Sequence, residues 1–425
     1  MSTSARAAFA GRVNQNFFYG WLMVAVAALG IFVSGPGQSH TFSVFIGPIS
    51  ADLGISQTVL ASAYATATLG AALVLPYMGR VVDQFGPRVS LITIAGLLGA
   101  ACLFFGAAAG YLWLALGFGL LRFFGQGSMM LGSANLVSQW FSAQRGFAMS
   151  LMVLGFGLSM AVHPNLGQYL IDVMGWRQAW VTMGILTWAL MLPPLILIVF
   201  DKPEDLGLAP DNAEVVEASE APKLTGLSLP EALRSPVFYV AAIAMSSLSM
   251  LVTTLHYHQF NIMTFQGMGA EWAGRSFTIS AITMVVVMTL VGRALDRYKT
   301  RYVMAVALVI QASSLTLVTF VTDVPSLIAY ALVFGLNNAC TMTIFGYVWP
   351  RFFGRLHLGK IQGTGQMLAV IGASIGPIPV SYAFDTSGDP TTMLRLLAII
   401  PLIAAVLALI WLRTPPGVEA PKGLD

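Results

Sequence analysis

Runs of about twenty apolar residues recur along the whole sequence, and they constrain its fold more than any other feature. A helix needs about 20 mostly apolar residues to cross the roughly 30 Å hydrocarbon layer of a bilayer, because it rises about 1.5 Å per residue. We therefore expect an all-α membrane protein with twelve transmembrane helices, in the ranges 17–45, 58–79, 89–109, 111–139, 146–171, 177–200, 236–264, 274–292, 302–322, 325–350, 361–384 and 391–413.

Charge and composition exclude several classes of protein. Only 9% of the residues are Asp, Glu, Lys or Arg, against about 25% in soluble proteins, so a soluble enzyme is excluded. A net charge of +3 is too small for a nucleic-acid surface. The two cysteines, Cys102 and Cys340, lie in apolar runs without metal-ligand spacing, and no GxxxxGK[ST] loop occurs. We expect neither an enzyme nor a cofactor or metal site.

The distribution of basic residues predicts how the chain lies in the membrane. If both termini share one side, 17 of the 21 Lys and Arg residues fall on that side, the exceptions being Arg122, Arg177, Arg275 and Arg395. Basic loops stay in the cytoplasm. We therefore expect a multi-pass protein of the cell (inner) membrane, acting as a monomer in the lipid bilayer, with both termini cytoplasmic.

An internal repeat divides the chain in two. Residues 79–89 (GRVVDQFGPRV) align with residues 292–302 (GRALDRYKTRY) at an offset of 213 residues, and the same offset relates Pro164 to Pro377. A duplicated six-helix unit explains both matches. We predict an N-terminal tail (1–16), a six-helix lobe (17–200), a Pro- and Glu-rich cytoplasmic linker (201–235), a second six-helix lobe (236–413) and a C-terminal tail (414–425).

These features resemble the major facilitator superfamily over nearly the whole chain. The resemblance rests on the twelve spans, the repeated loop and the run Arg122-Phe-Phe-Gly-Gln-Gly127. Residues 140–146 (WFSAQRG), 202–211 (KPEDLGLAPD) and 351–360 (RFFGRLHLGK) are similar to bacterial members near the monocarboxylate transporters and oxalate:formate antiporters. The resemblance implies two lobes that rock around a central substrate site.

Arg122 is the most informative single residue, because a charge in mid-membrane is costly and often marks a transport pathway. Gln126 lies one turn later on the same face. The alternative is that Arg122 binds backbone carbonyls of the first span and only fixes helix packing. The resemblance implies a role for this arginine in substrate binding or proton coupling.

The repeated loop suggests a gate at the cytoplasmic mouth. Asp83 can accept hydrogen bonds from the N-terminus of a facing helix and pair with Arg80 or Arg88. Solvated charges that only set topology are the alternative, but they leave unexplained an Asp at the same place in both halves. The predicted gating residues are Gly79, Arg80, Asp83, Arg88, Arg293, Asp296 and Arg301.

Polar residues inside the expected spans are further candidates for substrate binding. A helix break at Gly35-Pro36-Gly37 precedes Gln38 and His40, where freed backbone groups can line a cavity. Each side chain can instead serve only as a hydrogen-bonded link between helices. The predicted substrate-binding set is Arg122, Gln126, Gln38, His40, His258, Asn338, Tyr347 and Gln366.

These observations favour a secondary active transporter that moves a small organic solute by alternating access. A monocarboxylate-type anion with proton coupling fits best, although the second half lacks the mid-membrane Lys or Arg that the resemblance associates with such substrates, which disfavours oxalate. An exporter of amphipathic or drug-like compounds, suggested by the Phe- and Met-rich stretch 123–130, and a non-transporting membrane sensor are the alternatives.

Overall fold

The secondary structure of the protein is helical throughout the described residues. A computed structural model describes residues 3–15, 17–141, 144–212, 226–354 and 358–415, and these contain α-, 3₁₀- and π-helices, with only an isolated bridge between Gly226 and Gly354. Residues 213–225 of the expected linker and 416–425 of the expected tail lie outside these ranges. The expected all-α membrane fold is confirmed.

Internal contacts divide the chain into two compact units. The first contains Met1–Ile49 and Thr66–Ala221, and the second contains Ser50–Ala65 and Pro222–Asp425. The boundary after Ala221 falls inside the linker expected from the sequence. The short segment Ser50–Ala65 belongs by its contacts to the second unit, although it comes from the first half of the sequence.

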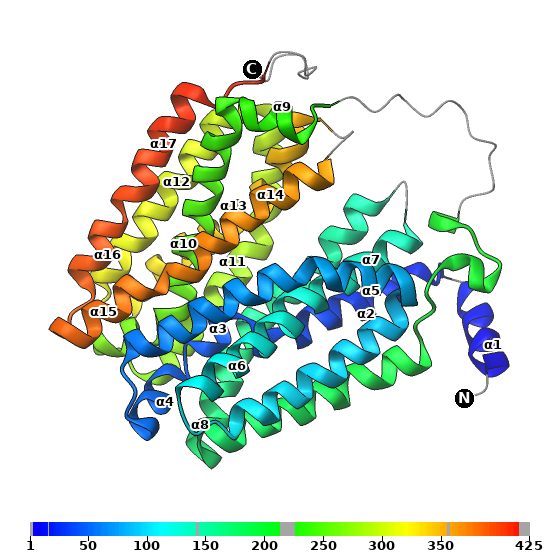
Figure 1. Cartoon of the computed structure of the whole chain (residues 1–425), viewed down its shortest axis with the longest axis horizontal. Helices are drawn as coiled ribbons and strands as arrows, with labels where there is room; N and C mark the ends of the chain where they lie inside the picture. The colour runs from blue at the N-terminus through cyan, green and yellow to red at the C-terminus, as the bar shows by residue number, and fades with distance from the viewer. Residues whose placement is uncertain (1–2, 16, 142–143, 213–225, 355–357, 416–425) are drawn as a thin grey trace. The chain divides into compact units, whose positions relative to one another are not determined.

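In the first unit, α2 packs along α8 and α7, and α3 packs against α8 (Figure 1). The elements from the N-terminus to residue 212 are α1 (Thr3–Asn14), α2 (Gly20–Val33), η1 (Gly35–Gly37), α3 (Ser39–Phe42), α4 (Ile46–Leu53), α5 (Gln57–Gly106), α6 (Tyr111–Leu121), η2 (Arg122–Met129), α7 (Met130–Trp140), α8 (Arg145–Leu197), η3 (Pro203–Leu206) and η4 (Pro210–Asn212).

In the second unit, α10 packs against α14, α11 against α13, and α12 against α17 (Figure 1). Its core includes Leu251, Leu255, Tyr330 and Phe334, all completely buried. The elements are α9 (Leu229–Arg234), α10 (Pro236–Phe265), α11 (Ala270–Arg297), α12 (Thr300–Leu317), η5 (Val318–Phe320), α13 (Val324–Phe353), α14 (Leu358–Ile375), α15 (Pro377–Ser387), α16 (Thr391–Leu397) and α17 (Ile399–Trp411).

Ten helices among the described residues are long and apolar enough to cross a membrane. The difference from the twelve expected spans has two causes. The label α8 covers both 146–171 and 177–200, which are two helices joined across a kink at Gly175 (φ 78°, ψ 162°). The first expected span is broken into α2, η1 and α3, so no single helix in it reaches spanning length.

The carbonyl groups of residues 195–200, at the end of α8, are bound by side chains from four other segments. Arg88 donates to Leu195 and Ile196, Arg6 donates to Leu197 and Val199, Tyr19 donates to Ile198, and Trp140 donates to Phe200. Terminal carbonyls have no partner within their own helix. These bonds therefore fix α1, α2, α5 and α7 to one end of the first unit.

Candidate functional site

The first expected span is interrupted at its centre by the 3₁₀ turn η1. Pro36 has no N–H group, and the chain leaves helical geometry at Gln38 (φ −95°, ψ 147°). The backbone groups at the break are satisfied locally, because Gly37 N–H donates to Ser34 and the Thr41 hydroxyl donates to the Gly35 carbonyl at 2.6 Å. The break is thus an ordered feature inside the first unit.

Arg122 meets this break from the fourth span. Its Nη1 donates to the Gly37 carbonyl at 3.1 Å and lies 3.4 Å from Ser39 Oγ, and only 4% of the residue is exposed. The contact with a backbone carbonyl of the first span is the one that the packing alternative predicts. It also holds a guanidinium in the interior of the unit, beside the 3₁₀ break in the first span.

The first and fourth spans approach each other closely at Gly37 and Gly125. A methyl group added to Gly37 would lie 2.3 Å from the Leu121 carbonyl oxygen and 2.8 Å from the Gly125 Cα atom. The fourth span adopts π-helical geometry from Arg122 to Met129. Short π-helical stretches within α-helices are frequent at functional sites, so the crossing combines close backbone approach, an irregular helix and a buried charge.

Two predicted glutamines lie at the same crossing. Gln38 Nε2 donates to Ser34 Oγ at 3.1 Å. The backbone nitrogen of Gln126 would lie 2.9 Å from a methyl group added to Gly37, and Gln126 itself is half-buried. The structure therefore brings Gln38, Arg122 and Gln126 together within the first unit.

Histidines of the first unit are connected through Ser159. Its Oγ lies 3.2 Å from His40 Nε2 and 3.2 Å from His163 Nδ1, and all three residues are buried. The hydroxyl can donate to one ring nitrogen and accept from the other. Sequence analysis missed Ser159, although its position four residues before His163 places both on one helix face.

His258, the predicted residue of the seventh span, links α10 to α15. Its Nε2 lies 2.9 Å from the Pro377 carbonyl oxygen and 3.2 Å from Ser381 Oγ, and the residue is completely buried. The neighbouring Gln259 donates to Ser276 Oγ at 2.7 Å and accepts from Tyr330 Oη at 3.3 Å. This second polar cluster was not predicted from the sequence.

The remaining predicted binding residues of the second unit lie in different surroundings. Asn338 Nδ2 donates to the Phe334 carbonyl of its own helix, while its Oδ1 is buried without a hydrogen-bond partner among the described residues. The Tyr347 hydroxyl donates to the Leu295 carbonyl at 3.0 Å. Gln366 is exposed. The structure gives no shared contact to these three residues within the described ranges.

The structure describes the side chains of the predicted gating residues except that of Asp83. Arg88 N–H donates to Asp201 Oδ1 at 2.8 Å, and its side chain binds the end of α8, so its described contacts are not with Asp83. The Asp83 side chain lies outside the described residues. Gly79 is half-buried, Arg80, Arg293 and Asp296 are exposed, and the half-buried Arg301 lies against the Tyr302 ring.

Asp201 approaches the chain reversal at Gly86 (φ 79°, ψ 161°), where a methyl group would lie 2.6 Å from its Oδ1. Positive φ and this close approach both require glycine. The repeated loop of the first unit is therefore bound to the end of α8 through Asp201 and Arg88. Sequence analysis did not identify Asp201 as a partner.

Asp385 binds the start of α5 within the second unit. The backbone N–H groups of Gln57 and Thr58 donate to its two carboxylate oxygens at 3.0 and 2.7 Å. Asn261 Nδ2 donates to Gln57 Oε1 at 3.2 Å. A carboxylate from a distant helix thus stabilises the N-terminus of α5, both by hydrogen bonds and through the helix dipole.

The described residues contain no group of three His, Cys, Asp or Glu side chains that could hold a metal ion. The buried groups near the break in the first span and in α10 are the guanidinium of Arg122, several imidazoles, and neutral hydrogen-bonding side chains. These groups can bind a solute or carry a proton.

Comparison with known protein families identifies the family of this chain. Its sequence matches the profile of the Major Facilitator Superfamily over residues 20–274 and 266–424. The chain belongs to the major facilitator superfamily. It is thus a multi-pass membrane protein of a transporter family, as its sequence features had suggested.

Two curated members of the superfamily and one solved structure are similar to this chain. Human monocarboxylate transporter 11 is 30% identical over 42% of this chain and 39% of its own. The oxalate:formate antiporter of Oxalobacter formigenes is 25% identical over 54% of this chain and 51% of its own. A bacterial homologue of the human lysosomal transporter Spinster shares the fold, with a TM-score of 0.71 and 13% identity over 93% of this chain and 97% of that one.

Proposed function

We propose that this major facilitator superfamily transporter is a secondary active transporter that moves a monocarboxylate-type organic anion. The observation that carries the proposal is the buried guanidinium of Arg122 beside the break in the first span. The six expected spans of the first half contain no Asp or Glu, so Arg122 gives their interior a net positive charge. A guanidinium fork matches the two oxygens of a carboxylate.

A single negative charge on the substrate fits the rest of the chain. The expected spans of the second half contain no Lys or Arg at mid-depth, so a dianion would meet only one strong counter-charge. The similarity to a human monocarboxylate transporter supports this substrate class. The similarity to an oxalate:formate antiporter is compatible with carboxylate recognition, although the missing second cation argues against oxalate itself.

Proton coupling is the second part of the proposal. Histidine has an ordinary pKa near neutral pH and is the usual side chain for proton exchange there. Because Ser159 is bonded to both His40 and His163, a change in protonation of one ring would reorient the hydroxyl and affect the other ring. His40 lies two residues after Gln38, at the same helix break that Arg122 contacts.

Alternating access is proposed to involve two sets of contacts, those of Asp385 with the start of α5 and those of the predicted gate in the repeated loop. The bonds from Gln57 and Thr58 to Asp385 would break and re-form during the cycle. The predicted lock of Asp83, for which Arg80 is the remaining partner in its loop because Arg88 binds the end of α8, would act at the other end of the helix that begins at Gln57. The distribution of basic residues suggests that both termini are cytoplasmic, so the Asp83 lock would be the cytoplasmic gate. We propose that the protein works as a monomer in the inner membrane.

A ligand screen tests the substrate class. Thermal unfolding of the purified protein would be followed with pairs of small acids and their neutral amides, such as lactate with lactamide, and with drug-like cations. We expect the acids to raise the unfolding temperature and the amides to leave it unchanged. Equal effects of acids and amides, or stabilisation by the cations alone, would reject the proposal and favour the drug exporter.

A further inference from the structure

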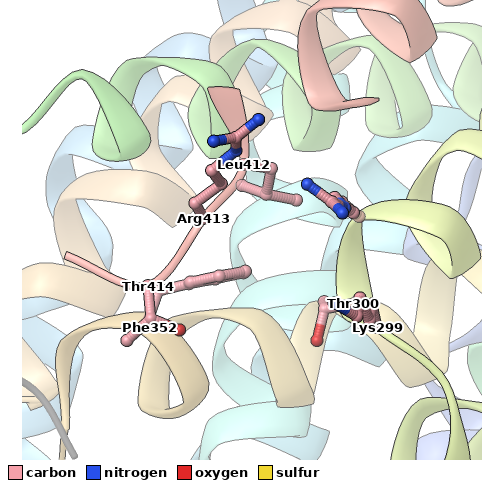
Figure 2. A pocket seen from close by; sticks show the side chains of 7 residues that line it. Lys299, Thr300, Phe352, Leu412, Arg413 and Thr414 are labelled. Atoms are coloured by element: carbon pink, nitrogen blue, oxygen red, sulfur yellow. The ribbon is translucent and has the colours of Figure 1, made fainter. Parts of the chain in front are cut away.

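A cavity of about 360 Å³ lies at the end of the second unit where α12 begins and α17 ends. It is lined by residues from three separate segments (Figure 2). The first segment enters α12, the second is close to the end of α13, and the third follows α17. The lining residues are Lys299, Thr300, Arg301, Phe352, Leu412, Arg413 and Thr414.

The cavity concentrates positive charge. Lys299, Arg301 and Arg413 line it, and no lining residue is acidic. Among the described residues, none of these three cations forms an ion pair with a carboxylate. The Nε atom of Arg301 is buried and has no hydrogen-bond partner in the described part of the chain. The adjacent Arg351 donates to Thr414 Oγ1 at 3.4 Å and adds a fourth cation.

The N-terminus of α12 adds to this electrostatic field. Lys299 is its N-cap residue, and no side chain caps the helix there. The first N–H groups of a helix have no partner within that helix, and they carry the positive end of its dipole. Such an end, combined with guanidinium groups, is a favourable environment for a phosphate.

The cavity lies at the ends of helices of spanning length, where the headgroups of a bilayer are expected. Helices of spanning length end at Phe353 and Trp411, next to lining residues, and another begins at the lining residue Thr300. The exposed aromatic side chains Tyr302 and Trp411 flank the cavity in sequence, as expected at a membrane–water interface. Phe352 and Leu412 give it apolar walls beside the cations.

We infer that this cavity binds a phosphate-bearing anion at the membrane surface. Its cations and the start of α12 would hold the phosphate, and Phe352 and Leu412 would contact the apolar part of the same molecule. An anionic phospholipid headgroup and a free phosphate share this chemistry. This site is separate from substrate transport, and an occupant would connect α12, α13 and the segment after α17.

A titration of the full-length protein tests the inference. Short-chain phosphatidylglycerol would be added to protein in neutral detergent, and the rise in unfolding temperature would give the apparent dissociation constant. A parallel titration with inorganic phosphate distinguishes a lipid from a free anion. The test variant is Lys299→Gln/Arg413→Gln, and the matched control is Arg297→Gln, an exposed cation at the end of α11 outside the lining.

We expect the double variant to bind phosphatidylglycerol at least about tenfold more weakly than the Arg297→Gln control. Stabilisation by phosphatidylglycerol but not by phosphate would assign a lipid, and equal stabilisation by phosphate would assign the free anion. Equal affinity of the double variant and the control for both probes would overturn the inference. If the double variant does not fold, Arg413→Gln, an exposed residue beyond the last helix, gives the same comparison with a smaller effect.

Discussion

The guanidinium of Arg122 donates to the carbonyl of Gly37 across 3.1 Å, joining the π-helical part of the fourth span to the 3₁₀ break of the first. This bond has two consequences. It fixes the crossing of two spans, and it keeps a cation at the 3₁₀ break of the first span. Packing and substrate binding are therefore compatible roles for Arg122, and substitutions can separate them.

The first prediction concerns Arg122. Arg122→Gln removes the charge and should lower carboxylate uptake by about tenfold to a hundredfold, because hydrogen bonds to charged groups contribute about 1.5–3 kcal/mol. Arg122→Lys keeps the charge without the fork and should give an intermediate rate. Uptake into proteoliposomes at equal protein content is the measurement. Arg12→Gln, an exposed cation of α1, is the control, and a Gln variant as active as that control would remove Arg122 from the mechanism.

The second prediction concerns the crossing of Gly37 with Gly125. Gly37→Ala would place a methyl group 2.3 Å from the Leu121 carbonyl, so the backbones must separate. We expect a loss of about 1–3 kcal/mol in stability, typical of overpacking, measured as a lower unfolding temperature. Gly96→Ala is the matched control, because its methyl group meets no atom within 4 Å. Equal unfolding temperatures for the two variants would show that the approach of the spans is not tight.

The third prediction concerns Asp385 and the start of α5. Asp385→Asn keeps the shape of the side chain but removes its charge, and one of its two acceptor atoms becomes a donor. The amides of Gln57 and Thr58 should then exchange with deuterium faster. Glu271→Gln, an exposed carboxylate at the start of α11, should leave their exchange unchanged. Unaltered exchange in Asp385→Asn would mean that the carboxylate does not hold α5.

The fourth prediction concerns acid stability. Asp323 caps α13, and hydrogen bonds from the side chain and backbone of Ser326 lower the pKa of its carboxyl group below the ordinary value of 3.8. A carboxyl group with a lowered folded-state pKa stabilises the protein above its unfolded-state pKa and loses this effect as pH falls through the folded value. Asp323→Ala should therefore lower the unfolding temperature at pH 7 and have progressively less effect below pH 3.8.

The control for this prediction is Glu204→Ala, which removes an exposed carboxylate. Its unfolding temperature should stay close to that of the unmodified protein across the same pH range. A pH-independent deficit of Asp323→Ala would show that the cap works without its charge. Asp389, whose pKa is also lowered by bonds from Thr391, should follow the same pH dependence as Asp323.

Local sequence patterns predicted most of the fold. Apolar runs located the spanning helices, because the thickness of a bilayer fixes their length, and Gly35-Pro36-Gly37 marked the break in the first span. The kink at Gly175 (φ 78°, ψ 162°) divides α8 into two helices, which correspond to the two apolar runs 146–171 and 177–200. Contacts such as Asp385 with Thr58 join residues 327 positions apart, and no local pattern reports them.

For the candidate site, the sequence predicted several of the charged and histidine residues but not the residues that they contact. A charge or histidine inside an apolar run is conspicuous, so Arg122, His40 and His258 were found from the sequence alone. Their partners were not found, because Ser159 and Ser381 are ordinary residues in helices and gain meaning only from the packing of α8 and α15. The π-helical geometry at Arg122 has no recognised sequence signal, although Gly125 and Gly127 permit it.

Uptake of labelled lactate and pyruvate into proteoliposomes, with an inward proton gradient imposed across the membrane, tests the central claim most directly. The account predicts accumulation above the external concentration, lost when a protonophore collapses the gradient and absent from protein-free vesicles. Uptake no greater than in protein-free vesicles for these and related monocarboxylates would contradict it.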